Sequence, residues 1–459
     1  MSTDVQNSWV ETFNSYKDKR LLWVFLLGCS SGFPWVLIGS NMSGWLTDAG
    51  LTRAAIGYFG SVFAVYAVNF LWAPLVDRVK LPILYPLLGQ RRSWIILCQA
   101  IILIATLAIT QMDPSINLLM TSAIALGIAV ASATKDIAID AFRIDTFSNT
   151  GTSKLPQASA MATIGWWTGY SLPGYLAFTN ADKYGWNQVY YVMAIITVIL
   201  MVFTLLTKEP ATERERLQKE AEQRHSDIVG TQSLSWFTVT VLEPFLDFFR
   251  RNGVKVAITL LLFVFLFKIG EAFLGRMSIT FYKEIGFSNQ DIGYYSKLIG
   301  WGATVFFALI SSAFNTRFGI VKGLLIGGSA MAGSNLMLTA IAIVGPDTDL
   351  LLFTVLVDNF TTAFSTVAFV SFLTALTGQA FSATQYALLA SLGNFSRTTL
   401  SSFSGELVDY LDTTLSGISA LASYITPWSV FFTITAIMVV PSLIMLVSLR
   451  DHFKKMLAE

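Results

Sequence analysis

The sequence predicts an all-α membrane protein with twelve transmembrane helices in two six-helix halves. Three observations carry this prediction: an apolar composition, twelve apolar runs of membrane-spanning length, and an internal repeat. Of the 459 residues, 54% are hydrophobic and 13% are charged, whereas soluble domains average about 25% charged residues. Thirty basic residues against twenty-nine acidic ones leave no excess charge to attract a nucleic acid, so we expect no such partner.

A run of about 20 apolar residues is long enough to cross a bilayer as a helix. A polar stretch at 208–254 separates six such runs from six more, which predicts an N-terminal half at 1–207, a cytoplasmic linker at 208–254 and a C-terminal half at 255–459. Within the linker, aromatic residues between 236 and 249 precede two arginines, a pattern typical of a helix at the membrane interface. The expected spans are 21–42, 55–76, 92–112, 118–141, 157–179, 187–207, 255–280, 291–314, 320–344, 350–376, 383–408 and 425–448.

Lysine and arginine placement predicts the orientation of these spans. With the N-terminus inside, twenty-one basic residues fall in cytoplasmic segments and three fall outside: Arg53, Lys183 and Lys283. Because cytoplasmic loops carry the excess of Lys and Arg, we expect both termini to be cytoplasmic.

An internal repeat relates the two halves. WLTDAGLTRAAIGYF at 45–59 aligns with FYKEIGFSNQDIGYY at 281–295 without a gap, and each copy joins the first and second spans of its half. Chance similarity of two outside loops is the alternative. Six-span halves repeated in parallel are the plan of major facilitator transporters, whose site lies at the midplane between the halves.

The fourth span ends in charged residues. Asp136, Asp140 and Arg143 share one helix face at spacings i, i+4 and i+7. A charge in hydrocarbon costs several kcal/mol on any scale, so this face should meet protein or water and is a candidate translocation pathway. The alternative is an ion pair that only holds helices together.

Other spans carry further charges that fit a cavity between the halves. Spans one, four, seven and ten line the central cavity of a major facilitator, and three of them hold ionisable side chains here. Lys268 and Glu271 lie on span seven and Asp358 on span ten, while span one offers Trp35 and Asn41. The first two residues are at i, i+3 and could simply neutralise each other.

A gate is expected where spans two and three are joined. PLVDR at 74–78 and GQRR at 89–92 resemble the major facilitator signature between these spans. We expect Asp77 to lie against the start of span eleven, where FSATQ at 381–385 supplies a capped helix N-terminus, because a carboxylate is stabilised there. The gating candidates are Asp77, Arg78, Arg91, Arg92 and Arg143, and simple topogenic charge is the alternative for the arginines at 78, 91 and 92.

Several motifs together resemble the AmpG-type muropeptide permeases and their acetyl-CoA transporter relatives. They are SGFP at 31–34, LWAPLVDR at 71–78, SATKDIAIDA at 132–141, FKIGE at 267–271, TAFSTVAFV at 362–370 and FSATQYALL at 381–389. The resemblance implies import of anhydro-muropeptides from periplasm to cytoplasm across the bacterial inner membrane, driven by the proton gradient without a cofactor. We expect a monomer whose partners are this substrate and the lipid bilayer. Lys135 departs from the family, which more usually has an uncharged amide there.

A glycopeptide substrate needs cations for its carboxylates, aromatic faces for its sugar rings and amides for its hydroxyls. The candidates for binding and translocation are Trp35, Asn41, Lys135, Asp136, Asp140, Lys268, Glu271, Gln385 and Arg397. For proton coupling we favour Asp358, which has no basic residue within four positions on its own span, and then Glu271.

Other functions fit the sequence less well. No metal-ligand cluster of His or Cys, no Gly-x-Ser-x-Gly elbow and no phosphate-binding loop occurs, so neither an enzyme nor an ATP-driven pump is expected. A transporter of another bulky anionic metabolite, such as acetyl-CoA or a siderophore, stays open as the alternative. Glycines at 165, 169, 174, 300 and 302 are expected to serve close helix packing.

Overall fold

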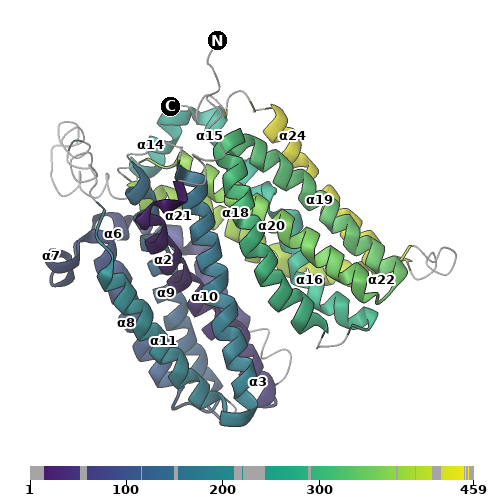
Figure 1. Ribbon diagram of the computed structural model, residues 1–459, viewed down its shortest axis with the longest axis horizontal. Coiled ribbons are helices and arrows are strands. Elements are labelled where there is room, and N and C mark those ends of the chain that lie inside the picture. The colour runs from purple at the N-terminus through teal and green to yellow at the C-terminus, as the bar shows by residue number, and fades with distance from the viewer. Residues whose placement is uncertain are drawn as a thin grey trace.

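The computed structural model describes residues 15–51, 59–114, 116–148, 154–210, 220, 243–287, 291–378, 381–398, 400–415, 425–448, 450 and 453. All regular elements of these segments are helical (Figure 1). Each predicted span coincides with one helix or with consecutive helical pieces in these segments. Within the described residues, eight helical stretches are long and apolar enough to cross a membrane, and some of these consist of consecutive pieces. The other four predicted spans do not reach this length and hydropathy.

The helices before the linker make up the first six spans. Span one runs without interruption through α2 (Lys19–Trp35), the π-helical turn η2 (Val36–Asn41) and α3 (Met42–Asp48). Span two is divided into η3 (Gly60–Ala64), α5 (Val65–Val68), η4 (Asn69–Leu71) and α6 (Ala73–Arg78). The remaining helices are η1 (Ser15–Lys17), α7 (Leu84–Leu88), α8 (Gln90–Ile109), α9 (Leu118–Phe147), α10 (Leu155–Tyr184) and α11 (Trp186–Leu206).

The linker and the last six spans follow the same pattern. Of the linker helix predicted at 236–249, the structure describes the part from Glu243 on, as α14 (Glu243–Asn252). Single helices are α19 (Ile320–Val344) and α20 (Thr348–Leu376). The divided spans are α15 (Val254–Phe267) with α16 (Ile269–Ile285), η6 (Ile292–Ile299) with α18 (Gly300–Phe318), α21 (Ser382–Thr398) with η8 (Leu400–Phe403) and α22 (Ser404–Leu415), and α23 (Pro427–Ile437) with α24 (Val440–Ser448).

Two groups of helices stand side by side, coloured purple to blue and green to yellow (Figure 1). We call the end that carries α6, α14 and the start of α21 the closed end, and the opposite end, with α3, the far end. Toward the far end, the buried apolar side chains form separate clusters, one drawn from 33–200 and the other from 273–432. Three further clusters contain buried residues from both groups. The described helices therefore share core side chains across the groups only in these last clusters. The boundaries predicted at 207 and 255 stay a prediction.

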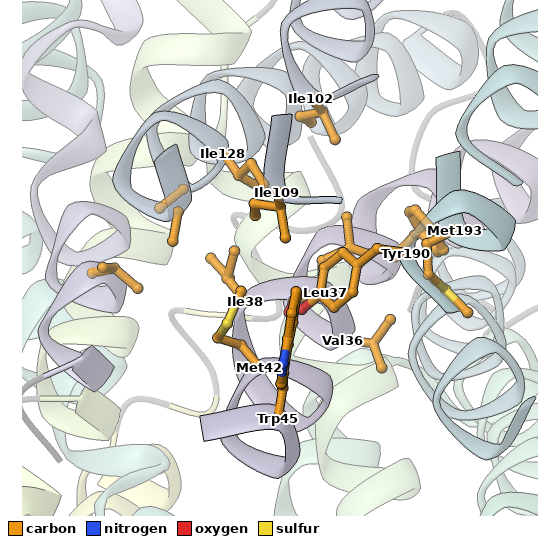
Figure 2. Packing of buried hydrophobic residues seen from close by; sticks show 14 of the residues in the cluster. Val36, Leu37, Ile38, Met42, Trp45, Ile102, Ile109, Ile128, Tyr190 and Met193 are labelled. Atoms are coloured by element: carbon orange, nitrogen blue, oxygen red, sulfur yellow. The ribbon is translucent and has the colours of Figure 1, made fainter. Parts of the chain in front are cut away.

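The π-helical turn of span one sits inside the cluster at the far end. Val36, Leu37 and Ile38 are fully buried around it, and the Tyr190 hydroxyl of α11 donates to the Leu37 carbonyl at 2.7 Å (Figure 2). A π-helical turn displaces carbonyls from the regular ladder, so a side-chain donor from a neighbouring helix satisfies this one.

The internal repeat has a structural counterpart. Gly50 and Gly286, which the alignment pairs, both have positive φ, 77° and 111°, within two residues of a helix end. The acidic positions also match. Asp48 accepts a hydrogen bond at 2.7 Å from the indole of Trp186, and Glu284 accepts one at 2.9 Å from the indole of Trp428. Trp186 begins the last span of the first half, and Trp428 lies in the first turn of the last span of the second half. Each copy of the repeat is therefore hydrogen-bonded to the equivalent helix of its own half.

Close packing of α2 on α10 depends on glycines. A Cβ added at Gly165 would overlap the Phe25 carbonyl oxygen, and one at Gly169 would overlap that of Cys29, which confirms the role predicted for these two glycines. Gly174 and Gly300 also pack closely, against Val36 and Asn359. The same prediction was wrong for Gly302, which faces open space.

Replacing Gly169 by alanine is therefore expected to force α2 and α10 apart and destabilise the protein by about 1–3 kcal/mol, the usual cost of overpacking. The matched control is Gly127→Ala, where an added Cβ meets nothing within 4 Å. That change should stabilise its helix slightly. Thermal unfolding in detergent measures both, and equal midpoints would contradict the packing argument.

Candidate translocation site and gate

Asp77 joins the two groups at the closed end. It lies near the end of α6, and its Oδ2 accepts hydrogen bonds from the backbone N–H and the hydroxyl of Thr384, both at 2.8 Å. The first turn of α21 leaves its N–H groups without helical partners, and a carboxylate satisfies them and the helix dipole together. The contact predicted between Asp77 and the start of span eleven is present.

Arg91 completes this contact from the start of α8. Its side chain is fully buried, and it donates to Asp77 Oδ1 at 2.9 Å, to Asp145 Oδ2 at 2.8 Å and to the Ser382 hydroxyl at 2.9 Å. Ser382 in turn donates to Asp145 Oδ1 at 2.9 Å. We call Asp77, Arg91, Asp145, Ser382 and Thr384 the latch. Asp145 was not among the predicted gating residues, although it ends the charged stretch of span four.

Arg143 makes a second connection between the groups. It pairs with Asp140 of its own helix at 3.0 Å and donates to the Thr374 hydroxyl of α20 at 2.9 Å. Its guanidinium carbon lies 5.1 Å from the ring centroid of Tyr386 on α21. A gating role stays a prediction, and the geometry is compatible with it because these contacts join α9 to two helices of the other group.

The other two predicted gating arginines lie beside the latch. The Arg92 side chain donates to the Leu205 carbonyl at 2.7 Å, near the end of α11, and so satisfies a helix terminus within its own group. Arg78 is half-buried after Asp77. Arg92 has a structural task that the sequence pattern did not indicate.

Among the predicted binding residues of span one, Trp35 packs in an aromatic group. Its ring centroid lies 4.7 Å from that of Phe63, 4.5 Å from that of Tyr66 and 5.8 Å from that of Trp166. Asn41 is fully buried, and its amide has no hydrogen-bond partner in the part of the chain that the structure describes. Buried polar groups of this kind usually bind water or a ligand.

The adjacent charges Lys135 and Asp136 have different partners. Lys135 is 1% exposed, and its ammonium donates to the Ser30 carbonyl of α2. Asp136 is half-buried and accepts a hydrogen bond from the Ser31 hydroxyl at 2.8 Å. Asp140, one turn later, has a side chain that is 33% exposed. Asp140 and Asp136 are thus both partly accessible on this face.

The charges of the second group converge on the break between α15 and α16. Lys268 lies in this break and donates to Glu271 at 2.5 Å and to the hydroxyls of Ser365 and Thr366 at 2.8 and 2.9 Å. Asp358 approaches from α20, near the Ser334 hydroxyl at 3.5 Å, and interacts electrostatically with Glu271 and Lys268. Asp358 therefore lies near the Lys268–Glu271 pair, although it is isolated along its own helix.

Two predicted binding residues remain. Gln385 is 1% exposed and has all its hydrogen bonds at the closed end: it accepts from Gly378 N and Arg251, and donates to the Pro244 carbonyl and Asp247. Its amide ties the linker helix α14 to the start of α21. The side chain of Arg397 lies outside the described residues, so its role stays a prediction.

Comparison with known proteins assigns the family. The family model of the Major Facilitator Superfamily matches residues 24–398. The chain is 32% identical to "Putative transporter AmpG 4" of Rickettsia conorii, over 95% of this chain and 97% of that protein. It is 30% identical to "Anhydromuropeptide permease" of Escherichia coli K12, over 95% of this chain and 81% of that protein. The chain belongs to the AmpG-type permeases of the major facilitator superfamily.

Solved structures show the same fold at low identity. The proton:xylose symporter XylE has a TM-score of 0.65 at 14% identity, with 94% of this chain and 95% of that chain covered. The human organic anion transporter MFSD10 has a TM-score of 0.61 at 15% identity, with 94% and 99% covered. As a member of this family, the protein is a multi-pass membrane transporter, as the sequence predicted.

Proposed function

We propose that this permease imports anhydro-muropeptides across the bacterial inner membrane, from periplasm to cytoplasm, by proton symport with alternating access. The substrate class is supported by the Escherichia coli relative named for it, to which nearly the whole chain aligns. The orientation in the membrane is supported by the basic residues at the closed end, which favour a cytoplasmic location for that end.

The latch is the observation that carries alternating access. It binds the two helix groups to each other at the closed end, while the apolar clusters toward the far end are separate. With the closed end in the cytoplasm, this is an outward-facing state. Import then requires the latch to open and the far end to close, as expected for rigid-body rocking of the groups around a central site.

The polar side chains between the groups suit a charged glycopeptide. The ammonium of Lys268 can meet a substrate carboxylate, Asp140 can accept from a peptide amine or a sugar hydroxyl, and the aromatic group of Trp35 can face a sugar ring. Acetyl-CoA and siderophores also carry anionic groups, so the substrate must be decided by experiment.

Uptake by right-side-out membrane vesicles tests this function. Vesicles that contain the protein should accumulate anhydro-muropeptide when a proton gradient is imposed, and should fail to do so when the gradient is collapsed. Free peptide, acetyl-CoA and a siderophore form the comparison panel. Accumulation of one of these in place of the muropeptide would contradict the proposed substrate. Uptake at the same rate with and without the proton gradient would contradict symport.

The orientation has its own prediction. A single cysteine at Ser226, in a background with Cys29 and Cys98 replaced, should resist impermeant thiol reagents in intact cells and react after permeabilisation. The basis is the excess of basic residues in the segments assigned to the cytoplasm. The control is a cysteine at Asn187, an exposed position at the far end that should react from outside. Rapid labelling of position 226 in intact cells would contradict the predicted topology.

A further inference from the structure

The connection between α6 and α8 carries an exposed apolar segment. Residues 81–88 read LPILYPLL, and their only polar side-chain group is one tyrosine hydroxyl. The structure buries none of the side chains of α7, and Ile83 and Leu87 are 79% and 74% exposed. These values exceed the 68% of Ile104, the most exposed large apolar residue of α8. We call residues 81–88 the apolar loop.

The apolar loop projects sideways from the molecule at the closed end. In Figure 1, α7 extends from α6 and the start of α8 away from the other helices, and no labelled helix lies over it. Further along, α8 also exposes the apolar side chains of Ile101 and Ile104. With 20 residues, α8 is about as long as a hydrocarbon core is thick, so its first turn, next to the apolar loop, is expected near the edge of that layer.

The base of the apolar loop is held rigidly. The Gln90 side chain donates to the carbonyls of Val76 and Val79, both at 2.9 Å, and the Trp94 indole donates to the Val79 carbonyl at 3.1 Å. Asp77 and Arg91, joined at 2.9 Å, close the hairpin from either side. A shift of the apolar loop relative to the bundle would therefore be transmitted to the latch.

Charge at the base favours an anionic surface. Lys80 is exposed, and its ammonium lies 4.5 Å from the ring centroid of Tyr85. An aromatic ring with a neighbouring cation is typical of the headgroup region, where the ring meets the acyl chains and the cation meets phosphates. Anionic lipid attracts such a basic residue, and the apolar side chains below it can enter the acyl boundary.

We propose that the apolar loop is a lipid anchor: it inserts into the anionic leaflet at the closed end and fixes the half of the latch that carries Asp77 and Arg91. The other half of the latch, at Ser382 and Thr384, then moves against an anchored partner. The occupant is the phospholipid leaflet, which matches the apolar side chains and the flanking lysine together.

A depth measurement tests insertion. A spin label at Leu87→Cys, in protein lacking Cys29 and Cys98 and reconstituted into nanodiscs of phosphatidylcholine with phosphatidylglycerol, should collide with oxygen and be shielded from a water-soluble nickel chelate. The control label at Asn187→Cys should behave in the opposite way. Equal access of the chelate to both labels would overturn the anchor. Spin–spin broadening that grows with protein concentration would assign the surface to a second copy and overturn it as well.

The link to the latch has a separate test. Ala387 is 4% exposed in a cluster shared between the groups, so a cysteine there reports opening of the closed end. The double variant Ile83→Asn with Leu87→Asn should increase thiol labelling of Ala387→Cys several-fold in anionic nanodiscs. The thermal unfolding midpoint should stay unchanged. Ile116→Asn, an equally exposed isoleucine at 77% in another connection, is the control. Labelling that is the same in the pair and the control would overturn the coupling.

Discussion

Asp77→Asn is expected to open the closed end and slow net uptake while the protein stays folded. The carboxylate of Asp77 accepts hydrogen bonds from Arg91, from the Thr384 N–H and from the Thr384 hydroxyl. The two bonds from Thr384 connect α6 to α21 of the other helix group. The asparagine side chain keeps one acceptor oxygen but carries no charge. Hydrogen bonds to charged groups contribute about 2 kcal/mol, so the population with a closed latch should fall roughly 30-fold relative to the population with an open latch.

Thiol labelling of Ala387→Cys from the closed end measures this shift, and uptake of the substrate measures its consequence. The matched control is Asp18→Asn. Asp18 is also a carboxylate at the closed end, but it pairs with Arg20 and Lys154 of its own group at 2.7 and 2.6 Å. The hydrogen bond from Arg20 lowers the pKa of Asp18, so this control also removes a charge that is present at neutral pH. If both variants label alike, Asp77 has no gating role and its charge serves only topology.

The sequence predicted the latch because two independent patterns met in it. A carboxylate followed the second span, and a capped helix start opened the eleventh, so a favourable contact could be inferred before any coordinates. The twelve spans were predictable for a similar reason, since the length and polarity of a membrane helix are set by the bilayer. Asp145 was not predicted as a gating residue because its partners, Arg91 and Ser382, lie on other helices. Helical spacing gives no information on contacts between helices.

Side-chain direction was the part that the sequence could not supply. Lys135 and Gln385 were grouped with the binding residues because they are polar and lie in spans. The structure directs the first to the Ser30 carbonyl and the second to α14 and residue 378. The same limit applies to Asp358, which is isolated along its own helix and yet close to Lys268 and Glu271. Spacing along one helix defines a face, whereas the partners of that face depend on packing.

Asp358→Asn is expected to abolish gradient-driven accumulation and preserve substrate exchange. Asp358 lies near Lys268, whose ammonium pairs with Glu271 at 2.5 Å. This group holds one excess negative charge, and within the described residues no ion pair to Asp358 is formed. A proton on Asp358 neutralises the excess when the site closes away from water, because an unpaired charge is costly there. We therefore propose that Asp358 carries the coupled proton.

Two measurements separate this role from a structural one. With asparagine at 358, the site is permanently neutral, so the carrier should cycle without a proton: the inside substrate concentration should only equal the outside one, while counterflow of labelled substrate continues. Asp349→Asn, an exposed aspartate in the first turn of the same helix, should leave both unchanged. Loss of accumulation and counterflow together would mean that Asp358 is needed for binding or folding. Full accumulation would mean that Asp358 does not carry the proton. The candidates would then be Glu271 and Asp136, the predicted site carboxylates that have a neighbouring lysine.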